Sequence, residues 1–72
     1  MTGYVGDFVH VAPGAHLAGE VLVEEGALLG IGSLLIPNIR VGKWATVGAG
    51  SVVLNDLPAD TVAFGVPARP QK

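Results

Sequence analysis

A hydrophobic residue recurs at every sixth position along most of the chain. This column holds only Val or Leu over eight consecutive repeats, although Val, Leu and Ile together make up only 22 of the 72 residues. A six-residue period matches neither the 3.6-residue period of an amphipathic helix nor the alternation of long strands. It indicates a β-helix, in which each repeat forms one side of a coil. The column consists of Val5, Val11, Leu17, Val23, Leu29, Leu35, Val41 and Val47.

Two further columns share this period and predict the shape of the coil. A column of small or aliphatic residues runs from Val9 to Ser51, and the residue before each of its members is Gly or Asn in five of eight repeats. Gly and Asn enter the positive-φ region most easily, so these positions predict sharp corners. We therefore predict a triangular coil of about 18 residues, stacked at about 4.8 Å. The corner column consists of Phe8, Gly14, Glu20, Gly26, Gly32, Asn38, Trp44 and Gly50.

The repeats predict a single all-β domain over residues 1–72. The repeat region covers residues 5–52, which is under three coils, and residues 53–72 form a C-terminal extension. Within the extension, Thr61–Val66 is predicted as a strand that leaves the prism. Pro67–Pro70 is predicted as an extended tail, because residues before proline avoid the helical region.

The composition excludes several classes of protein. The chain has no cysteine, which excludes disulfides and Cys-based metal sites. The net charge of −2 argues against nonspecific nucleic-acid binding. No apolar run approaches the roughly 20 residues of a membrane span, and Asp7 and early glycines interrupt any signal-peptide core. We therefore expect a soluble cytoplasmic protein that binds neither nucleic acid nor membrane.

The charges are distributed unevenly along the chain. Residues 1–36 carry four carboxylates and no Lys or Arg, whereas the second half carries all four basic residues, Arg40, Lys43, Arg69 and Lys72. The second half is therefore the better place for a phosphate-bearing ligand. The alternative is that these are solvated surface charges without a ligand.

A short prism leaves apolar side chains outside its core. Leu22, Leu28, Leu34 and Ile36 fall outside the inward columns. Packing three prisms side by side would bury such residues, and a closed cyclic symmetry makes the assembly finite. We therefore predict a C3 homotrimer.

One edge of the predicted prism is nearly bare backbone. Stacking the coils every 18 residues places two columns of small residues there, and the other two edges hold bulkier residues. Such an edge would let a thin, amide-rich ligand such as the pantetheine arm of coenzyme A bond to the backbone. The alternative is that glycine simply suits tight corners. The edge comprises Ala12, Gly30 and Gly48, then Pro13, Ile31 and Ala49, then Gly14, Gly32 and Gly50.

Several motifs resemble one enzyme family over roughly residues 5–70. The chain is similar to the C-terminal β-helix of NeuD/PglD-type sugar O- and N-acetyltransferases, members of the hexapeptide-repeat acyltransferase superfamily. The resemblance implies a left-handed β-helix and acetyl-CoA as substrate. The motifs are Gly6-Asp7-Phe8-Val9-His10-Val11, Ala18-Gly19, Gly30-Ile31-Gly32-Ser33, Pro37-Asn38-Ile39, Val47-Gly48-Ala49-Gly50-Ser51-Val52-Val53 and Gly65-Val66-Pro67-Ala68-Arg69.

The resemblance also implies roles for individual residues. His10 would lie at a subunit interface near the thioester, and the Gly19 N–H would donate to the acetyl carbonyl. The backbone at Ile31 and Ala49, with the adjoining Gly30 and Gly48, would hold the pantetheine arm. Arg69 would face the phosphates of coenzyme A.

The chain departs from this family at its N-terminal end. Members of the family begin with a sugar-binding domain that has no counterpart here, and their general-base His falls at the position of Met1. We therefore expect an acetyl-CoA-binding core that is inactive or poorly active alone, with His10 as a substitute base or a packing residue. The alternative is a truncated or engineered trimeric scaffold without activity. The acceptor sugar is left open.

A zinc enzyme is a third hypothesis. Gamma-type carbonic anhydrases share this fold and bind zinc through three His side chains, whereas this chain has only His10 and His16. We therefore expect no metal site.

Overall fold

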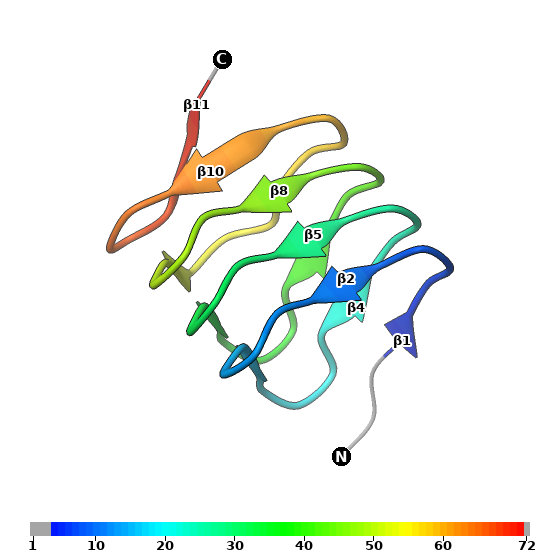
Figure 1. Cartoon of the computed structure of the whole chain (residues 1–72), viewed down its shortest axis with the longest axis horizontal. Coiled ribbons are helices and arrows are strands. Elements are labelled where there is room, and N and C mark those ends of the chain that lie inside the picture. Colours follow the sequence, from blue (N-terminus) through cyan, green and yellow to red (C-terminus); the bar gives the residue numbers. More distant parts are fainter. Residues whose placement is uncertain (1–3, 72) are drawn as a thin grey trace.

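The computed structural model describes residues 4–71, which form three parallel sheets wound into a triangular prism (Figure 1). No helix in this range is long and apolar enough to cross a membrane. Sheet A consists of β1 (Tyr4–Val5), β4 (Leu22–Val23) and β7 (Arg40–Val41). Sheet B consists of β2 (His10–Val11), β5 (Leu28–Leu29), β8 (Thr46–Val47), β10 (Val62–Phe64) and β11 (Arg69–Gln71). Sheet C consists of β3 (His16–Leu17), β6 (Leu34–Leu35) and β9 (Val52–Val53).

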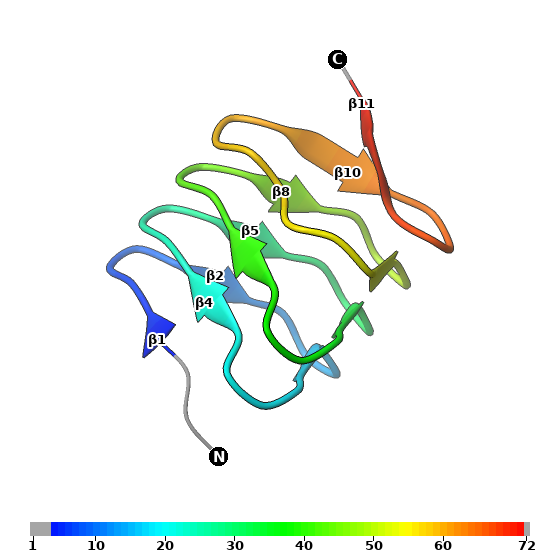
Figure 2. The same ribbon diagram turned by 180° about the vertical axis from the view of Figure 1, so that it is seen from behind.

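The register of the sheets confirms the predicted coil. Tyr4 pairs with Leu22, and Leu22 pairs with Arg40, so neighbouring strands are 18 residues apart. Hydrogen bonds of 2.8 Å, such as Leu28 N–H to the Ala45 carbonyl, join each coil to the next. Figure 2 shows the stacked coils from behind, with β2, β5, β8 and β10 following one another along one side.

The two inward columns form the core of the prism. Their members in the middle and later coils are fully or almost fully buried, as predicted from the six-residue period. Ser33 and Ser51 are the buried polar members of the small-residue column. In the first coil the column residues Val5 and Val11 remain 49% and 43% exposed, because no strand among residues 4–71 covers β1 or β2 on that side. The buried apolar residues are Val21, Val23, Ala27, Leu29, Leu35, Ile39, Val41, Ala45, Val47, Val53, Leu57 and Ala63.

All eight predicted corner positions adopt positive φ. The corners at Phe8, Glu20 and Trp44 do so with φ values of 62°, 60° and 60°, although these residues disfavour that region. The stacked strands on either side set the backbone at each corner, so the fold imposes the conformation whatever the side chain. The cost at a residue with a Cβ atom is roughly 1–2 kcal/mol.

The coil continues beyond the last six-residue repeat, with two residues fewer. Val41 pairs with Leu57 and Val47 pairs with Ala63, a spacing of 16 residues in place of 18. The prediction that Thr61–Val66 leaves the prism is therefore wrong, because β10 pairs in parallel with β8 and stays in sheet B. The two-residue deletion had moved the repeat out of phase.

The C-terminal segment closes one end of the prism. Strand β11 folds back antiparallel onto β10, so the predicted tail is part of sheet B. Gly65 accepts a hydrogen bond from the Val52 N–H, and the Ala68 N–H donates to the Val52 carbonyl, so the connecting segment covers the edge of sheet C. The peptide bond between Val66 and Pro67 is cis.

Candidate functional site

The edge between sheets B and C carries a stack of three similar turns. We call it the glycine edge; it comprises residues 12–15, 30–33 and 48–51. In each turn the fourth N–H donates to the first carbonyl, at 3.2 Å from Ala15 to Ala12, 3.2 Å from Ser33 to Gly30 and 3.3 Å from Ser51 to Gly48. A glycine at positive φ occupies the third position, which is typical of a type II turn. Pro13 at the second position of the first turn also fits this type.

The central peptides of these turns form a ladder along the edge. Gly32 N–H donates to the Pro13 carbonyl at 3.2 Å, and Gly50 N–H donates to the Ile31 carbonyl at 2.7 Å. The N–H groups of Ile31 and Ala49 have no hydrogen-bond partner among residues 4–71. Both residues are exposed. The edge therefore presents one available N–H donor on each of two successive coils.

The glycines of this edge serve two different purposes. A Cβ atom at Gly30 would lie 2.7 Å from the Ala49 nitrogen, and one at Gly48 would lie 2.6 Å from the Phe64 Cβ. Close packing of the coils therefore accounts for these two glycines, and Phe64 covers Gly48. A Cβ atom at Gly32 or Gly50 would meet nothing within 4 Å. In the second and third turns the open part of the edge thus consists of Ile31, Gly32, Ala49 and Gly50.

Two buried serines support the glycine edge from inside. The Ser33 hydroxyl donates to the Gly30 carbonyl at 2.9 Å, within the same turn. The Ser51 hydroxyl accepts from the Gly65 N–H at 3.1 Å, which ties the third turn to the C-terminal segment. Because their hydroxyl groups are satisfied within the protein, these serines stabilise the turns.

The predicted site residues do not all come together in one copy. Gly30, Ile31, Gly48 and Ala49 share the glycine edge. His10 is exposed on the outer face of sheet B and pairs with Leu28. Gly19 and Arg69 lie elsewhere.

Gly19 lies on a different edge of the prism. Its carbonyl accepts from the Asn38 N–H at 3.2 Å, on the corner between sheets C and A. We call this corner, with residues 18–21 and 36–39, the third edge. Arg69 is exposed on β11, opposite Phe64 in the register. Met1, the position expected for the base, lies outside the described residues.

The two His side chains lie on different sheets. His10 belongs to β2 in sheet B and His16 to β3 in sheet C, so one copy does not bring them together. Within residues 4–71 no group of three or more His, Cys, Asp or Glu side chains is arranged to hold a metal ion.

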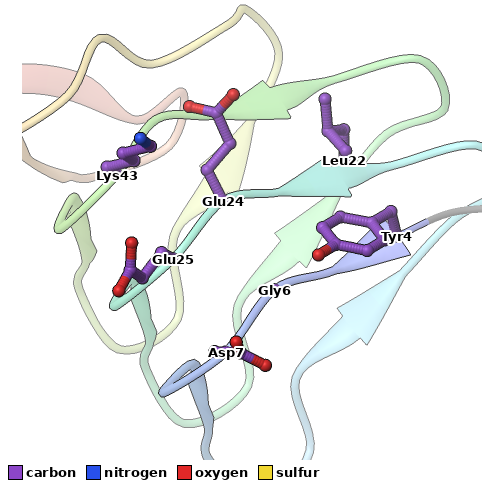
Figure 3. Close-up of a pocket in the computed structure, with 7 residues that line it drawn as sticks. All are labelled: Tyr4, Gly6, Asp7, Leu22, Glu24, Glu25 and Lys43. Atoms are coloured by element: carbon purple, nitrogen blue, oxygen red, sulfur yellow. The ribbon is translucent and has the colours of Figure 1, made fainter.

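The structure also shows a pocket that the sequence analysis missed. It lies on the outer face of sheet A and has a volume of about 320 Å³. Figure 3 shows Tyr4 and Leu22 on one side of it and Asp7, Glu25 and Lys43 on the other. Glu24, also in the lining, forms an ion pair of 3.3 Å with Arg40. Residues 7, 25 and 43 are 18 positions apart and all charged, so stacking by 18 could have revealed this column.

The fold and the repeat define the class of this protein. Three parallel sheets, six-residue sides and positive-φ corners make it a hexapeptide-repeat left-handed β-helix. No protein-family model matches the chain. Its homologues are nevertheless clear, and they are hexapeptide-repeat acetyltransferases. This confirms the family resemblance predicted from the motifs.

Two curated relatives illustrate the relationship. The chain is 42% identical to the 2,3,4,5-tetrahydropyridine-2,6-dicarboxylate N-acetyltransferase of Staphylococcus aureus (strain bovine RF122 / ET3-1), with 89% of this chain and 30% of the relative covered. It is 44% identical to the galactoside O-acetyltransferase of Lactococcus lactis subsp. lactis (strain IL1403), with 75% and 26% covered. The chain thus spans between a quarter and a third of the length of these curated relatives.

Solved structures show the same likeness in three dimensions. PerB from Caulobacter crescentus, solved with CoA and GDP-perosamine, superposes with a TM-score of 0.93 at 44% identity, with 94% of this chain and 33% of PerB covered. A serine acetyltransferase in complex with CoA superposes with a TM-score of 0.84 at 45% identity, with 88% and 28% covered.

Proposed function

We propose that this chain is the acetyl-CoA-binding β-helix of a sugar acetyltransferase and acts in the cytoplasm. The observation that carries the proposal is the pair of exposed N–H groups at Ile31 and Ala49 on the glycine edge, neither of which has a hydrogen-bond partner within residues 4–71. Successive coils are about 4.8 Å apart, so the two donors follow the prism axis. The two homologues solved with CoA support the choice of ligand.

Coenzyme A fits the chemistry of this edge. Its pantetheine arm is narrow and carries amide carbonyls, which can accept from the Ile31 and Ala49 N–H groups. Bare glycine backbone at Gly32 and Gly50 leaves room for such an arm to lie close. Arg69, near the C-terminal end of the prism, supplies a positive charge for the phosphates.

Acetyl transfer needs a nucleophile, a base and an oxyanion donor. The acceptor oxygen or nitrogen attacks the thioester carbon, the C–S bond breaks, and the proton lost by the acceptor ends on the thiol of coenzyme A. In our proposal His10 lies beside the thioester, and the Gly19 N–H donates to the carbonyl oxygen. His10 is exposed, which leaves its imidazole accessible to a substrate.

The proposed site requires more than one copy of the chain. Gly19 belongs to the third edge, whereas Ile31 and Ala49 belong to the glycine edge, and these are different corners of the prism. One acetyl-CoA can therefore contact both only where the third edge of one copy lies beside the glycine edge of another. A homotrimer provides this arrangement three times.

We predict that the 72-residue chain binds coenzyme A but does not acetylate sugars at a measurable rate. The prediction rests on the family resemblance, which places the general base at the position that Met1 occupies in this chain. The measurement is calorimetric titration with coenzyme A, together with a thiol-release assay using acetyl-CoA and amino or neutral sugars. Turnover that His10→Ala abolishes would contradict this account, because His10 would then be a sufficient base.

The second candidate is a structural trimeric scaffold without a ligand. One observation favours it: coil packing alone explains Gly30 and Gly48, so these glycines do not require a ligand. The same titration separates the two candidates. If the chain does not bind coenzyme A at millimolar concentration, the structural scaffold is the candidate that remains.

A further inference from the structure

The two ends of the prism differ in how they are covered. At the C-terminal end, β11 covers β10 and residues 65–68 cover the edge of sheet C, so the column residues Val53 and Ala63 there are fully buried. At the N-terminal end, β1 and β2 belong to the outermost coil (Figure 1), and no strand within residues 4–71 lies beyond them. The column residues Val5 and Val11 are 49% and 43% exposed there. The prism thus has one closed end and one open end.

The open end also exposes unpaired strand edges. The N–H groups of His10 and Ala12, which flank Val11, both donate to the second coil at 2.9 Å. Because backbone N–H and C=O groups alternate in direction along a strand, those of the column residue between them point the other way, toward the open end. The same holds on all three strands of the first coil, for Val5, Val11 and Leu17. Free edges of this kind recruit further strands.

A second copy of the chain fits such an end. The C-terminal end is covered, so copies cannot stack head to tail through their ladders. They can meet only with their open ends face to face, about a two-fold axis perpendicular to the prism axis. Such an axis preserves the hand and the pitch of the coil, and it makes the facing strands antiparallel. The contact is closed, so it stops at two prisms.

One register pairs every free strand of the open end. With β2 opposite the β2 of the other copy, β1 lies opposite β3, and β3 lies opposite β1. Val11 then faces the partner's Val11, and Val5 faces the partner's Leu17, so the inward column continues across the contact. The coil climbs as it winds, so an axis centred on β1 or β3 instead would leave strands unpaired or place two strands at one level.

The same register brings opposite charges together. Gly6 lies opposite the partner's His16, so the Asp7 carboxylate, one position further on, comes within reach of that imidazole. Asp7 and His16 are both exposed, and within residues 4–71 neither side chain has a hydrogen-bond or ion-pair partner. The two-fold axis forms this pair twice. The contact is therefore complementary in charge as well as in backbone pairing.

We propose that two copies bind face to face through their open ends, with β2 paired with β2 and β1 paired with β3. Val5, Val11 and Leu17 are then buried in a core that runs through both prisms, and the His16 imidazole N–H donates to the partner's Asp7 carboxylate. The contact uses only the end of the prism. It is therefore separate from the proposed acetyl-CoA site and from any packing of prisms side by side.

A matched pair of substitutions tests this contact. Val11 and Val62 both belong to sheet B and are 43% and 42% exposed, but Val11 lies at the open end and Val62 at the closed end. Light scattering should give the wild-type chain twice the mass of folded Val11→Asp, in which two carboxylates would meet at the axis. Val62→Asp should keep the wild-type mass. Equal masses for the wild type and folded Val11→Asp would overturn the proposal, as would a halved mass in Val62→Asp alone.

Disulfide cross-linking covers the case in which Val11→Asp fails to fold. The chain has no cysteine, so one introduced cysteine can form a disulfide only between copies. Opposite residues of an antiparallel pair have Cα atoms about 5.5 Å apart, within the range of a disulfide. Val11→Cys should therefore oxidise to a covalent dimer at least 10-fold faster than Val62→Cys. Equal rates would contradict the contact. A Val11→Cys dimer that does not bind coenzyme A would refute the proposed function but leave this contact standing.

Discussion

Neighbouring glycines of the glycine edge have different roles. One allows the coils to pack closely, and the other faces the open space where a ligand would lie. Gly30 and Gly32 are two positions apart, yet a Cβ atom at Gly30 would lie 2.7 Å from backbone atoms, and one at Gly32 would meet nothing within 4 Å. Gly32 has a φ of 69°, so its requirement is conformational. The sequence showed both glycines but did not distinguish these reasons, because they depend on the distance to the next coil.

This difference predicts unequal losses of stability. Gly30→Ala should lower the free energy of unfolding by about 3 kcal/mol, since the backbone of the next coil must move. Gly32→Ala should cost only about 1 kcal/mol, from the positive φ. Urea unfolding at one fixed protein concentration measures both values, since association contributes to apparent stability. Equal losses would show that the coils are not packed as closely as the structure has them.

At the scale of the element, the repeat predicted the β-helix and its corners. Every corner position predicted from the six-residue period adopts positive φ, even where the residue is Phe8 or Trp44. The period alone identified these two, because their own propensities argue against a corner. The repeat did not predict the last coil, because deletion of two residues between Val53 and Leu57 broke its phase.

The shortened coil is held partly by a side chain. The Arg40 N–H donates to the Asp56 carboxylate at 2.8 Å, while the Leu57 N–H donates to the Arg40 carbonyl at 2.9 Å. Asp56 thus supplies an acceptor where a full coil would supply a backbone carbonyl. The Asp56 carboxylate takes the place of a backbone carbonyl as hydrogen-bond acceptor. Sheet A therefore ends at Leu57 without leaving the Arg40 N–H unsatisfied.

Asp56 should therefore matter for the C-terminal coil. Asp56→Ala should destabilise the protein by about 1 kcal/mol, the usual net value of one hydrogen bond. Asp56→Asn keeps an acceptor oxygen and should recover most of this loss. Hydrogen exchange at Arg40 provides a local check, with faster exchange expected in the Ala variant only. Identical exchange in the wild type and both variants would refute the role given to Asp56.

At the scale of the whole molecule, the sequence predicted half of the candidate site. Stacking by 18 brought Gly30, Ile31, Gly48 and Ala49 together, and the structure places them on one edge. Whether Gly19 joins that edge in one site depends on which faces neighbouring copies share. A one-dimensional repeat carries no such information.

In the proposed function the Ile31 and Ala49 N–H groups bind coenzyme A, and proline substitution tests this role. The second position of a type II turn favours proline, and Pro13 already occupies that position in the first coil. Ala49→Pro should therefore keep or slightly raise stability while removing one donor. Pro13→Ala, on the same edge, is the matched control.

The deciding measurement is calorimetric titration of coenzyme A into the wild type, Ala49→Pro and Pro13→Ala, with the melting temperature of each recorded. We expect binding at least 10-fold weaker in Ala49→Pro, which corresponds to about 1.4 kcal/mol, and unchanged in Pro13→Ala. Wild-type affinity in a folded Ala49→Pro variant would contradict the claim that this edge binds coenzyme A.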